Sequence, residues 1–145
     1  MKQNLLVGIG NKGRGDDGLG WAFVDHFKNV HKLKVIYRYQ LQVEDAELIS
    51  HYRQVWFADA SAEDYGHGFK IEPLEALTRF NYTTHALHPA AVLGLCRQLF
   101  DSEPKAFIIG ITGEDFSLGQ SLSVKGRFNL EQALSFFHDY YPQHQ

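Results

Sequence analysis

The chain has 145 residues, 44% of them hydrophobic and 21% charged, which is typical of one soluble globular domain spanning residues 1–145. A formal net charge of −3, with both signs intermixed, argues against nucleic acid or a membrane surface as the partner. A single cysteine, Cys96, excludes an intrachain disulfide, and with neither a signal-peptide pattern nor an apolar run of ~18 residues we expect a cytoplasmic protein.

The first half of the sequence predicts three strands and two helices. Leu5–Ile9 is apolar throughout and is followed by a glycine-broken loop, which is typical of a short buried strand and a turn. The i, i+4, i+7 spacing of Phe23, Phe27 and Val30 predicts one face of a helix. The pattern then predicts a strand over Lys34–Gln40, a short polar helix over Glu44–His51 and a buried strand over Gln54–Ala60.

The second half predicts an edge strand, a helix, another buried strand and a final helix. Pro73 lacks an N–H, so Phe69–Pro73 is predicted at the edge of the sheet. For the same reason Pro89 predicts the first turn of a helix. The apolar stripe of this helix is predicted to contain Val92, Leu95, Cys96 and Leu99. The remaining predictions are a strand over Lys105–Ile111, a helix with Leu130, Ala133, Leu134, Phe137 and Tyr141 on one face, and a frayed tail over residues 142–145.

Strands and helices therefore alternate along the chain without a linker or a repeat. This order predicts a single-domain, doubly wound α/β fold with a mostly parallel sheet of about five strands and helices on both faces. In such sheets the functional groups lie beyond the carboxyl ends of the strands. We therefore expect the functional residues in the loop after Ile9, in the loop at Asp59 and in the loop after Ile111.

The glycines Gly8, Gly10 and Gly13 form a G-x-G-x-x-G pattern after a strand, which is one signature of dinucleotide binding. Three features argue against this interpretation. The carboxylates of Asp16 and Asp17 follow the loop closely and would repel a pyrophosphate. The next helix is predicted to begin after the third glycine, so its N-terminus is not placed at that glycine as the dinucleotide pattern requires. The acidic residue that this pattern places at the end of the second strand is missing. Because Arg38 at that position is able to meet a ribose phosphate, a dinucleotide-dependent enzyme stays an alternative.

Four segments, in this order, resemble the motifs of the nickel–iron hydrogenase maturation endopeptidases. The first comprises Gly8–Asn11 with Gly15–Gly20, and the second is Phe57–Ala60, which contains Asp59. The third is Thr83–His85, and the closing segment is Gly110–Gly113 with Phe116, Gly119, Leu122 and Ser123. The matches cover nearly the whole chain, and the set is much more specific than any single motif.

This resemblance implies an endopeptidase that removes a C-terminal peptide from the large subunit of a nickel–iron hydrogenase after nickel insertion. The family residues understood to contact nickel fall on Asp17, Asp59 and His85, which the resemblance makes both the metal-contacting and the catalytic residues. The implied partner is the hydrogenase large-subunit precursor. The nickel is recognised in this substrate and is not stably bound by the enzyme, which we expect to act as a monomer.

Two neighbouring residues compete with the implied ones. Asp16 is predicted to cap the helix after the glycine loop, which leaves Asp17 to face the edge of the sheet. If Pro89 begins a helix, His88 is its cap and His85 lies in the preceding loop, from which it can face the same edge. Many members of this family carry glutamate at the position of Asp17, so the side chain that bears the carboxyl group is one methylene shorter in this chain.

The chemistry of peptide-bond attack stays open at this point. Carboxylate and imidazole are competent nickel ligands, and together they would discriminate a metal-loaded precursor from an empty one. The sequence has no G-x-S-x-G elbow and no H-E-x-x-H motif, and Cys96 is predicted in the core. A water polarised by the metal, or by an aspartate acting as base, is the most economical hypothesis. A non-catalytic, metal-sensing maturation chaperone on the same fold is a second alternative.

Overall fold

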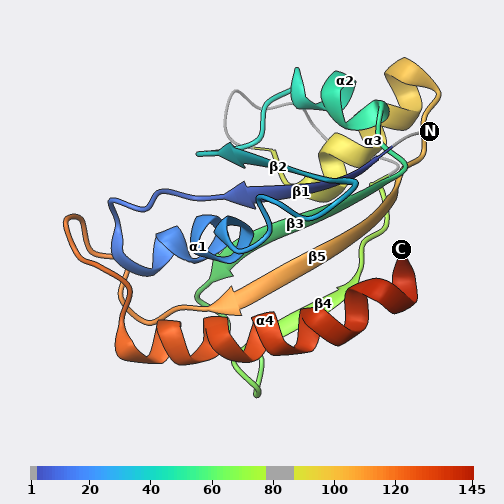
Figure 1. Cartoon of the computed structure of the whole chain (residues 1–145). Coiled ribbons are helices and arrows are strands. Elements are labelled where there is room, and N and C mark those ends of the chain that lie inside the picture. Colours follow the sequence, from blue (N-terminus) through green and yellow to red (C-terminus); the bar gives the residue numbers. More distant parts are fainter. Residues whose placement is uncertain (1–2, 78–86) are drawn as a thin grey trace.

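The computed structural model describes residues 3–77 and 87–145, which are arranged around a five-stranded sheet in the order β2-β1-β3-β5-β4 (Figure 1). The parallel strands are β1 (Asn4–Ile9), β2 (Leu33–Arg38), β3 (Gln54–Ser61) and β5 (Lys105–Thr112). At one edge β4 (Phe69–Pro73) pairs antiparallel with β5, as predicted from Pro73. The predicted mostly parallel, five-stranded sheet is therefore confirmed.

Helices cover both faces of this sheet (Figure 1). A 3₁₀ helix, η1 (Gly15–Gly18), leads into α1 (Leu19–Asp25), which lies with α4 (Val124–His144) on one face. On the other face lie α2 (Asp45–Ser50) and α3 (Pro89–Phe100). Within the described residues no helix is long and apolar enough to cross a membrane.

Two hydrophobic cores, one on each face, explain the apolar strands. Successive side chains of a strand point to opposite faces, so Leu5 and Val7 pack against α2 and α3, whereas Leu6 packs against α1 and α4. Trp56 of β3 stacks on Phe107 of β5 at a ring-centroid distance of 3.9 Å on the α4 side. Because both faces of the sheet are covered, the central strands β1, β3 and β5 are mostly apolar, whereas the edge strands β2 and β4 contain charged residues.

Three details of the sequence prediction are wrong. The first helix ends at Asp25, so Phe27 and Val30 lie in the turns that lead to β2, although Phe27 still packs on the core. Leu99 is 54% exposed and falls outside the buried stripe of α3. The tail is not frayed, because α4 continues to His144, whose ring stacks on Tyr140 at 3.8 Å and whose carbonyl accepts a hydrogen bond from a side chain of β3.

The close approach of α1 to the sheet depends on Gly20. A Cβ atom at this position would lie 2.4 Å from the carbonyl oxygen of Ala58 and 2.5 Å from that of Ile9. We therefore expect Gly20→Ala to lower the free energy of unfolding by about 2 kcal/mol in urea titrations, through overpacking. Alanine usually stabilises a helix relative to glycine by up to ~1 kcal/mol, so an unchanged or raised stability would contradict this close approach.

Candidate active site at the carboxyl edge of the sheet

The switch point of this fold lies between β1 and β3. The chain leaves β1 for β2 on one side and returns to β3 on the other, so the carboxyl ends of the central strands part there. In open α/β sheets this crevice is the usual position of a functional site. Ile9, the last residue of β1, is in register with Asp59 of β3, and the glycine loop joins β1 to η1, which contains Asp17.

The glycine loop fixes the side chain of Asp17. The backbone N–H of Asn11 donates to Oδ2 of Asp17 at 3.0 Å and to its carbonyl oxygen at 3.1 Å. Gly10 has a φ of +134°, and a Cβ atom there would lie 2.1 Å from the same carbonyl oxygen. Glycine is required at this position so that the chain can fold Asp17 back over the end of β1.

Asp59 lies close enough to Asp17 for the two carboxyl groups to influence each other. Burial raises the pKa of Asp59, the negative charge of Asp17 raises it further, and the Ala60 amide opposes both, which brings it to about 7. A carboxyl group with this pKa is present in both its protonated and its ionised form near pH 7. A carboxyl group tuned in this way by burial and by a like charge is typical of a functional site.

Of the two candidate histidines, His85 and His88, the structure describes only His88. His85 lies outside the described residues, so its predicted role stays a prediction. His88 is the N-cap of α3, as predicted, and its Nδ1 accepts a hydrogen bond from the N–H of Ala90 at 3.0 Å. A neutral imidazole that accepts at Nδ1 carries its proton on Nε2, which leaves no free lone pair for a metal. His88 therefore fits a capping role better than a ligand role.

Asp16 does not cap α1, and that prediction is wrong. Its carboxylate is fully buried and accepts hydrogen bonds from the N–H groups of Glu114 at 2.7 Å and Asp115 at 3.0 Å. It also accepts from Ser123, through the N–H at 2.8 Å and the hydroxyl at 2.6 Å. Burial alone would raise the pKa of Asp16, but these hydrogen bonds outweigh it and the pKa is lowered. Asp16 thus ties the loop carrying Asp17 to the β5–α4 loop and to the start of α4.

A cavity of about 270 Å³ lies beside Asp59 and was not foreseen from the sequence. Its lining includes His88 and two residues that follow β3, Tyr65 and Lys70. The Lys70 ammonium lies 5.0 Å from the centre of the Tyr65 ring and 3.4 Å from Oε1 of Glu72. No sequence signal marks these residues, because they reach the site only when β4 pairs with β5.

The structure gives no support to dinucleotide binding. Nε of Arg38 pairs with Oδ1 of Asp45 at 3.0 Å, and its Nη1 donates to the Tyr37 carbonyl at 2.9 Å. The Arg38 guanidinium therefore links β2 to α2. Gly8 allows close helix packing, since a Cβ atom there would lie 2.7 Å from a methyl group of Val24.

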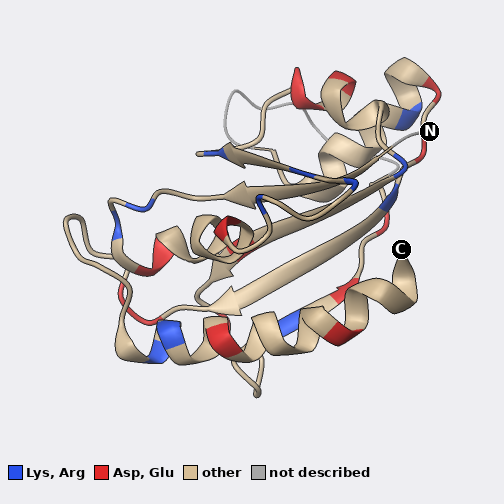
Figure 2. Cartoon of the chain, in the orientation of Figure 1, with Lys and Arg blue, Asp and Glu red and all other residues tan. Residues whose placement is uncertain are grey.

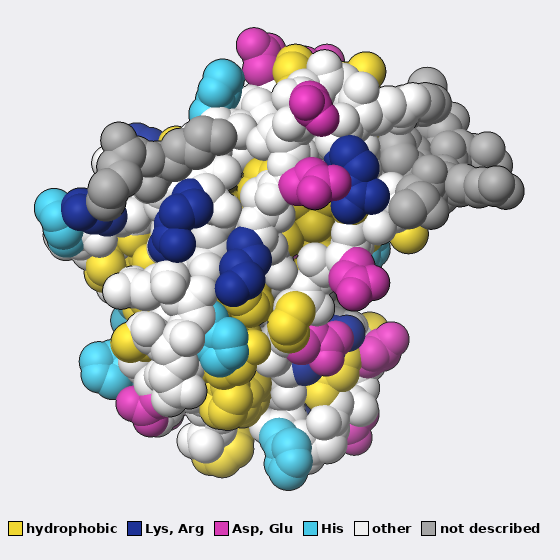
Figure 3. Space-filling view, turned by 90° about the vertical axis from the view of Figure 1, so that its right-hand side faces the viewer, with side chains coloured by type: hydrophobic (Ala, Val, Ile, Leu, Met, Phe, Trp, Pro, Cys, Tyr) yellow, Lys and Arg dark blue, Asp and Glu magenta, His cyan; other side chains and the backbone are white. Residues whose placement is uncertain are grey.

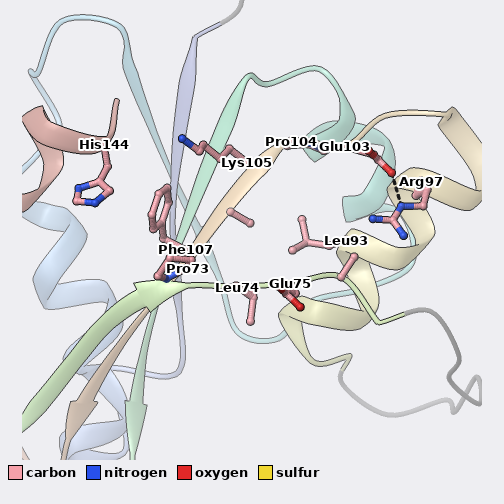
Figure 4. A pocket seen from close by; sticks show the side chains of 12 residues that line it. Pro73, Leu74, Glu75, Leu93, Arg97, Glu103, Pro104, Lys105, Phe107 and His144 are labelled. Atoms are coloured by element: carbon pink, nitrogen blue, oxygen red, sulfur yellow. Dashed lines mark ion pairs between the residues drawn. The ribbon is translucent and has the colours of Figure 1, made fainter.

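A larger cavity, of about 570 Å³, lies at the opposite, amino edge of the sheet between α3, β5 and the residues after β4. Leu74, Leu93 and Phe107 contribute its apolar lining, and Lys105 and the Arg97–Glu103 ion pair lie at its margin (Figure 4). The same end of the molecule carries side chains of both charge signs around exposed hydrophobic atoms (Figure 3). It is remote from Asp17 and Asp59, so cavity size does not identify the site here.

Within residues 3–77 and 87–145, no group of three His, Cys, Asp or Glu side chains is placed to hold a metal ion. Asp17 and Asp59 alone are a pair of oxygen donors. A metal recognised at this edge therefore needs further ligands from outside this set of residues.

Comparison with known proteins shows where this fold occurs. No protein-family model and no curated protein matches the sequence. Solved structures do match, among them the hydrogenase maturating endopeptidase HybD from E. coli, with a TM-score of 0.78 and 19% identity over 97% of this chain and 93% of that chain. The [NiFe] hydrogenase maturation protease HycI from Thermococcus kodakarensis has a TM-score of 0.70 and 22% identity over 95% and 91%. A hydrogenase 2 maturation peptidase from a Thaumarchaeota archaeon has a TM-score of 0.69 and 18% identity over 97% and 98%. The chain therefore has the fold of the hydrogenase maturation endopeptidases.

Proposed function

We propose that the protein is an endopeptidase that removes a C-terminal peptide from the nickel-loaded large subunit of a nickel–iron hydrogenase. The observation that carries the proposal is the pairing of Asp17 and Asp59 at the switch point, where their proximity and burial raise the pKa of Asp59 to about 7. The fold shared with hydrogenase maturation proteases and the four sequence motifs support the same activity. A cytoplasmic location and action as a monomer belong to this proposal as expectations.

In this proposal Asp17, Asp59 and His85 contact the nickel that the precursor carries. An approaching cation favours the ionised form of Asp59, so recognition of the metal displaces the proton that this carboxyl holds near pH 7. An empty precursor leaves the Asp17–Asp59 repulsion unrelieved. The site thereby discriminates the loaded precursor from the empty one by electrostatics.

The cleavage step needs a water molecule and a base. In the proposed hydrolysis the water oxygen bonds to the scissile carbonyl carbon while the ionised Asp59 takes a water proton. The carbon–nitrogen bond then breaks, and the proton passes to the leaving amine. The cavity of about 270 Å³ beside Asp59 offers space for a residue of the precursor near this bond.

The test is cleavage of a nickel-loaded large-subunit precursor by the wild type and by Asp17→Asn, Asp59→Asn and His85→Ala. We expect each variant to lose about 100-fold or more of the cleavage rate, because each removes a group that contacts the metal or moves a proton. A matched histidine control, His138→Ala, changes an exposed residue of α4 and is expected to cleave normally. Nickel-free precursor should resist the wild type.

Two results would contradict the proposal in different ways. Binding of the loaded precursor by the wild type without cleavage would favour the metal-sensing chaperone. Neither binding nor cleavage, together with stabilisation by NAD or NADP, would favour the dinucleotide-dependent enzyme. Full cleavage by Asp59→Asn would leave the endopeptidase in place and remove Asp59 from the mechanism.

A further inference from the structure

Three neighbouring strands place Asp59 and Lys70 on the same face of the sheet. Asp59 of β3 is in register with Gly110 of β5, and Gly110 is in register with Lys70 of β4. Residues in register on neighbouring strands direct their side chains to the same face. This face is the one that α2 and α3 cover, since Phe57 and Ile108, two positions earlier on β3 and β5, pack there. Two strand spacings separate the Cα atoms of Asp59 and Lys70 by roughly 10 Å.

The missing side chain of Gly110 leaves room for Tyr65 between these two residues. A Cβ atom at position 110 would lie 3.0 Å from both Cε2 and Oη of Tyr65, which is closer than ordinary van der Waals contact. Gly110 does not have a positive φ, so its backbone conformation does not require glycine. What glycine provides here is space, because it lets the phenol end of Tyr65 lie over β5.

The cavity of about 270 Å³ has an acidic side and a basic side. Among the described residues that line it, Lys70 is the only lysine or arginine. The carboxylates of the lining belong to Asp59 and to Glu63, which is exposed. Between Asp59 and Lys70, β5 carries a charged residue only at its amino end (Figure 2). Lys70 therefore faces Asp59 across an uncharged strand, with the Tyr65 ring between them.

The contacts that Lys70 makes within the chain are weak. Its ion pair with Glu72 has side chains that are 36% and 55% exposed, and an exposed pair of this kind contributes only ~0–1 kcal/mol to stability. The contact of its ammonium with the Tyr65 ring, 5.0 Å from the ring centre, adds ~0.5–1 kcal/mol at an exposed site. These contacts orient Lys70 beside the cavity without making it essential for the fold.

We propose that the Tyr65 hydroxyl and the Lys70 ammonium stabilise the oxyanion that forms on the scissile carbonyl of the precursor. When the water oxygen bonds to the carbonyl carbon, the π electron pair moves onto the carbonyl oxygen, while Asp59 takes a water proton and becomes neutral. A carbonyl oxygen directed away from Asp59 meets a hydrogen-bond donor and a positive charge at the moment when its own charge develops. The electron pair then returns to the carbon, the carbon–nitrogen bond breaks, and the leaving amine takes the proton. This inference rests on the proposed function.

The test separates kcat from KM for cleavage of the nickel-loaded precursor. The variants are Tyr65→Phe, which deletes only the hydroxyl, Lys70→Met, which removes the charge at similar length, and Lys70→Arg, which keeps the charge. The matched controls, Tyr52→Phe and Lys34→Met, make the same changes at the amino edge of the sheet, before β3 and on β2. Binding of the precursor is measured in an Asp59→Asn background, so that the precursor is not consumed. Unchanged thermal melting shows that each variant is folded.

We expect kcat to fall about 100-fold in Tyr65→Phe and in Lys70→Met, because each change removes an interaction made only with the transition state. For the same reason KM and the affinity for the precursor should stay within about twofold of the wild type, so saturating precursor should not restore the rate. Lys70→Arg should keep most of the rate, and both controls should cleave like the wild type.

Three results would contradict this inference. Wild-type kcat in either folded variant, Tyr65→Phe or Lys70→Met, would overturn the role of that residue and leave the proposed function standing. A raised KM with unchanged kcat would also overturn it, since the residue would then bind the ground state of the precursor and not the oxyanion. A wild-type chain that does not cleave the loaded precursor would overturn both the inference and the proposed function.

Discussion

Asp16→Asn is expected to lower the free energy of unfolding by about 3–5 kcal/mol at pH 7, because it breaks a buried, fully paired carboxylate. Oδ2 of Asp16 accepts from the N–H groups of Glu114 and Asp115 and from the Ser123 hydroxyl, and Oδ1 accepts from the Ser123 N–H. Asparagine has one acceptor oxygen, so its NH₂ group must face at least one of these donors. Gly126 packs closely against this carboxylate, since a Cβ atom there would lie 2.4 Å from Oδ1.

Urea unfolding measures this effect, with Ser123→Ala as the graded control. Removing the Ser123 hydroxyl deletes one hydrogen bond to Asp16 and is expected to cost only about 1–2 kcal/mol. The pKa of Asp16 is lowered, so its stabilising contribution is present above its unfolded-state pKa and is lost as pH falls below about 4. The gap between wild type and Asp16→Asn should therefore narrow in acid. A constant gap would show that shape, and not charge, is what the site requires.

Asp59→Asn, unlike Asp16→Asn, is expected to stabilise the folded protein at neutral and higher pH. It is also expected to lose most of the cleavage activity. Burial and the Asp17 charge raise the pKa of Asp59 to about 7, far above its value in an unfolded chain. Between about pH 4 and pH 7 the folded state holds a proton that the unfolded state releases, so stability falls as pH rises through this window. Asparagine has no charge to desolvate. The variant should therefore be more stable than the wild type at pH 8, by an amount on the order of 4 kcal/mol.

Thermal and urea unfolding at several pH values measure this difference. The two proteins should be nearly equal near pH 4, diverge up to pH 7 and keep a constant difference above it. Asp17→Asn removes the like charge and is expected to lower the pKa of Asp59, which moves the window of divergence to lower pH. Equal stability of the wild type and Asp59→Asn at pH 8 would show that Asp59 is solvated and that its pKa is not raised. A more stable but inactive variant is the mark of a residue kept for function.

Features encoded in neighbouring residues were predicted correctly from the sequence. The apolar runs Leu5–Ile9 and Ala106–Ile111 predicted buried strands, because a strand covered on both faces needs no polar side chain. Pro89 predicted both the start of α3 and the capping role of His88, since an N-cap bond spans only two residues. The order of these elements also led to the proposal of a functional site at the carboxyl edge of the sheet.

Interactions between residues distant in the chain were not predictable in this way. The donors to Asp16 lie 98 to 107 positions away, so its assignment as a local cap was wrong. The persistence of α4 to His144 depends on a hydrogen bond with Gln54, 90 positions away, and Tyr65 and Lys70 reach Asp59 only through strand pairing.

The sequence by itself determined the fold class and indicated the edge of the sheet at which the site is proposed, because both follow from the local period of apolar residues and from the order of the elements. Only the tertiary structure decided that Asp16, predicted as a local helix cap, instead anchors the β5–α4 loop and the N-cap of α4. It also brings Asp59 close to Asp17, and burial together with this like charge raises the pKa of Asp59 to about 7. The physical reason is that burial, the proximity of like charges and surface exposure are properties of residues brought together in space.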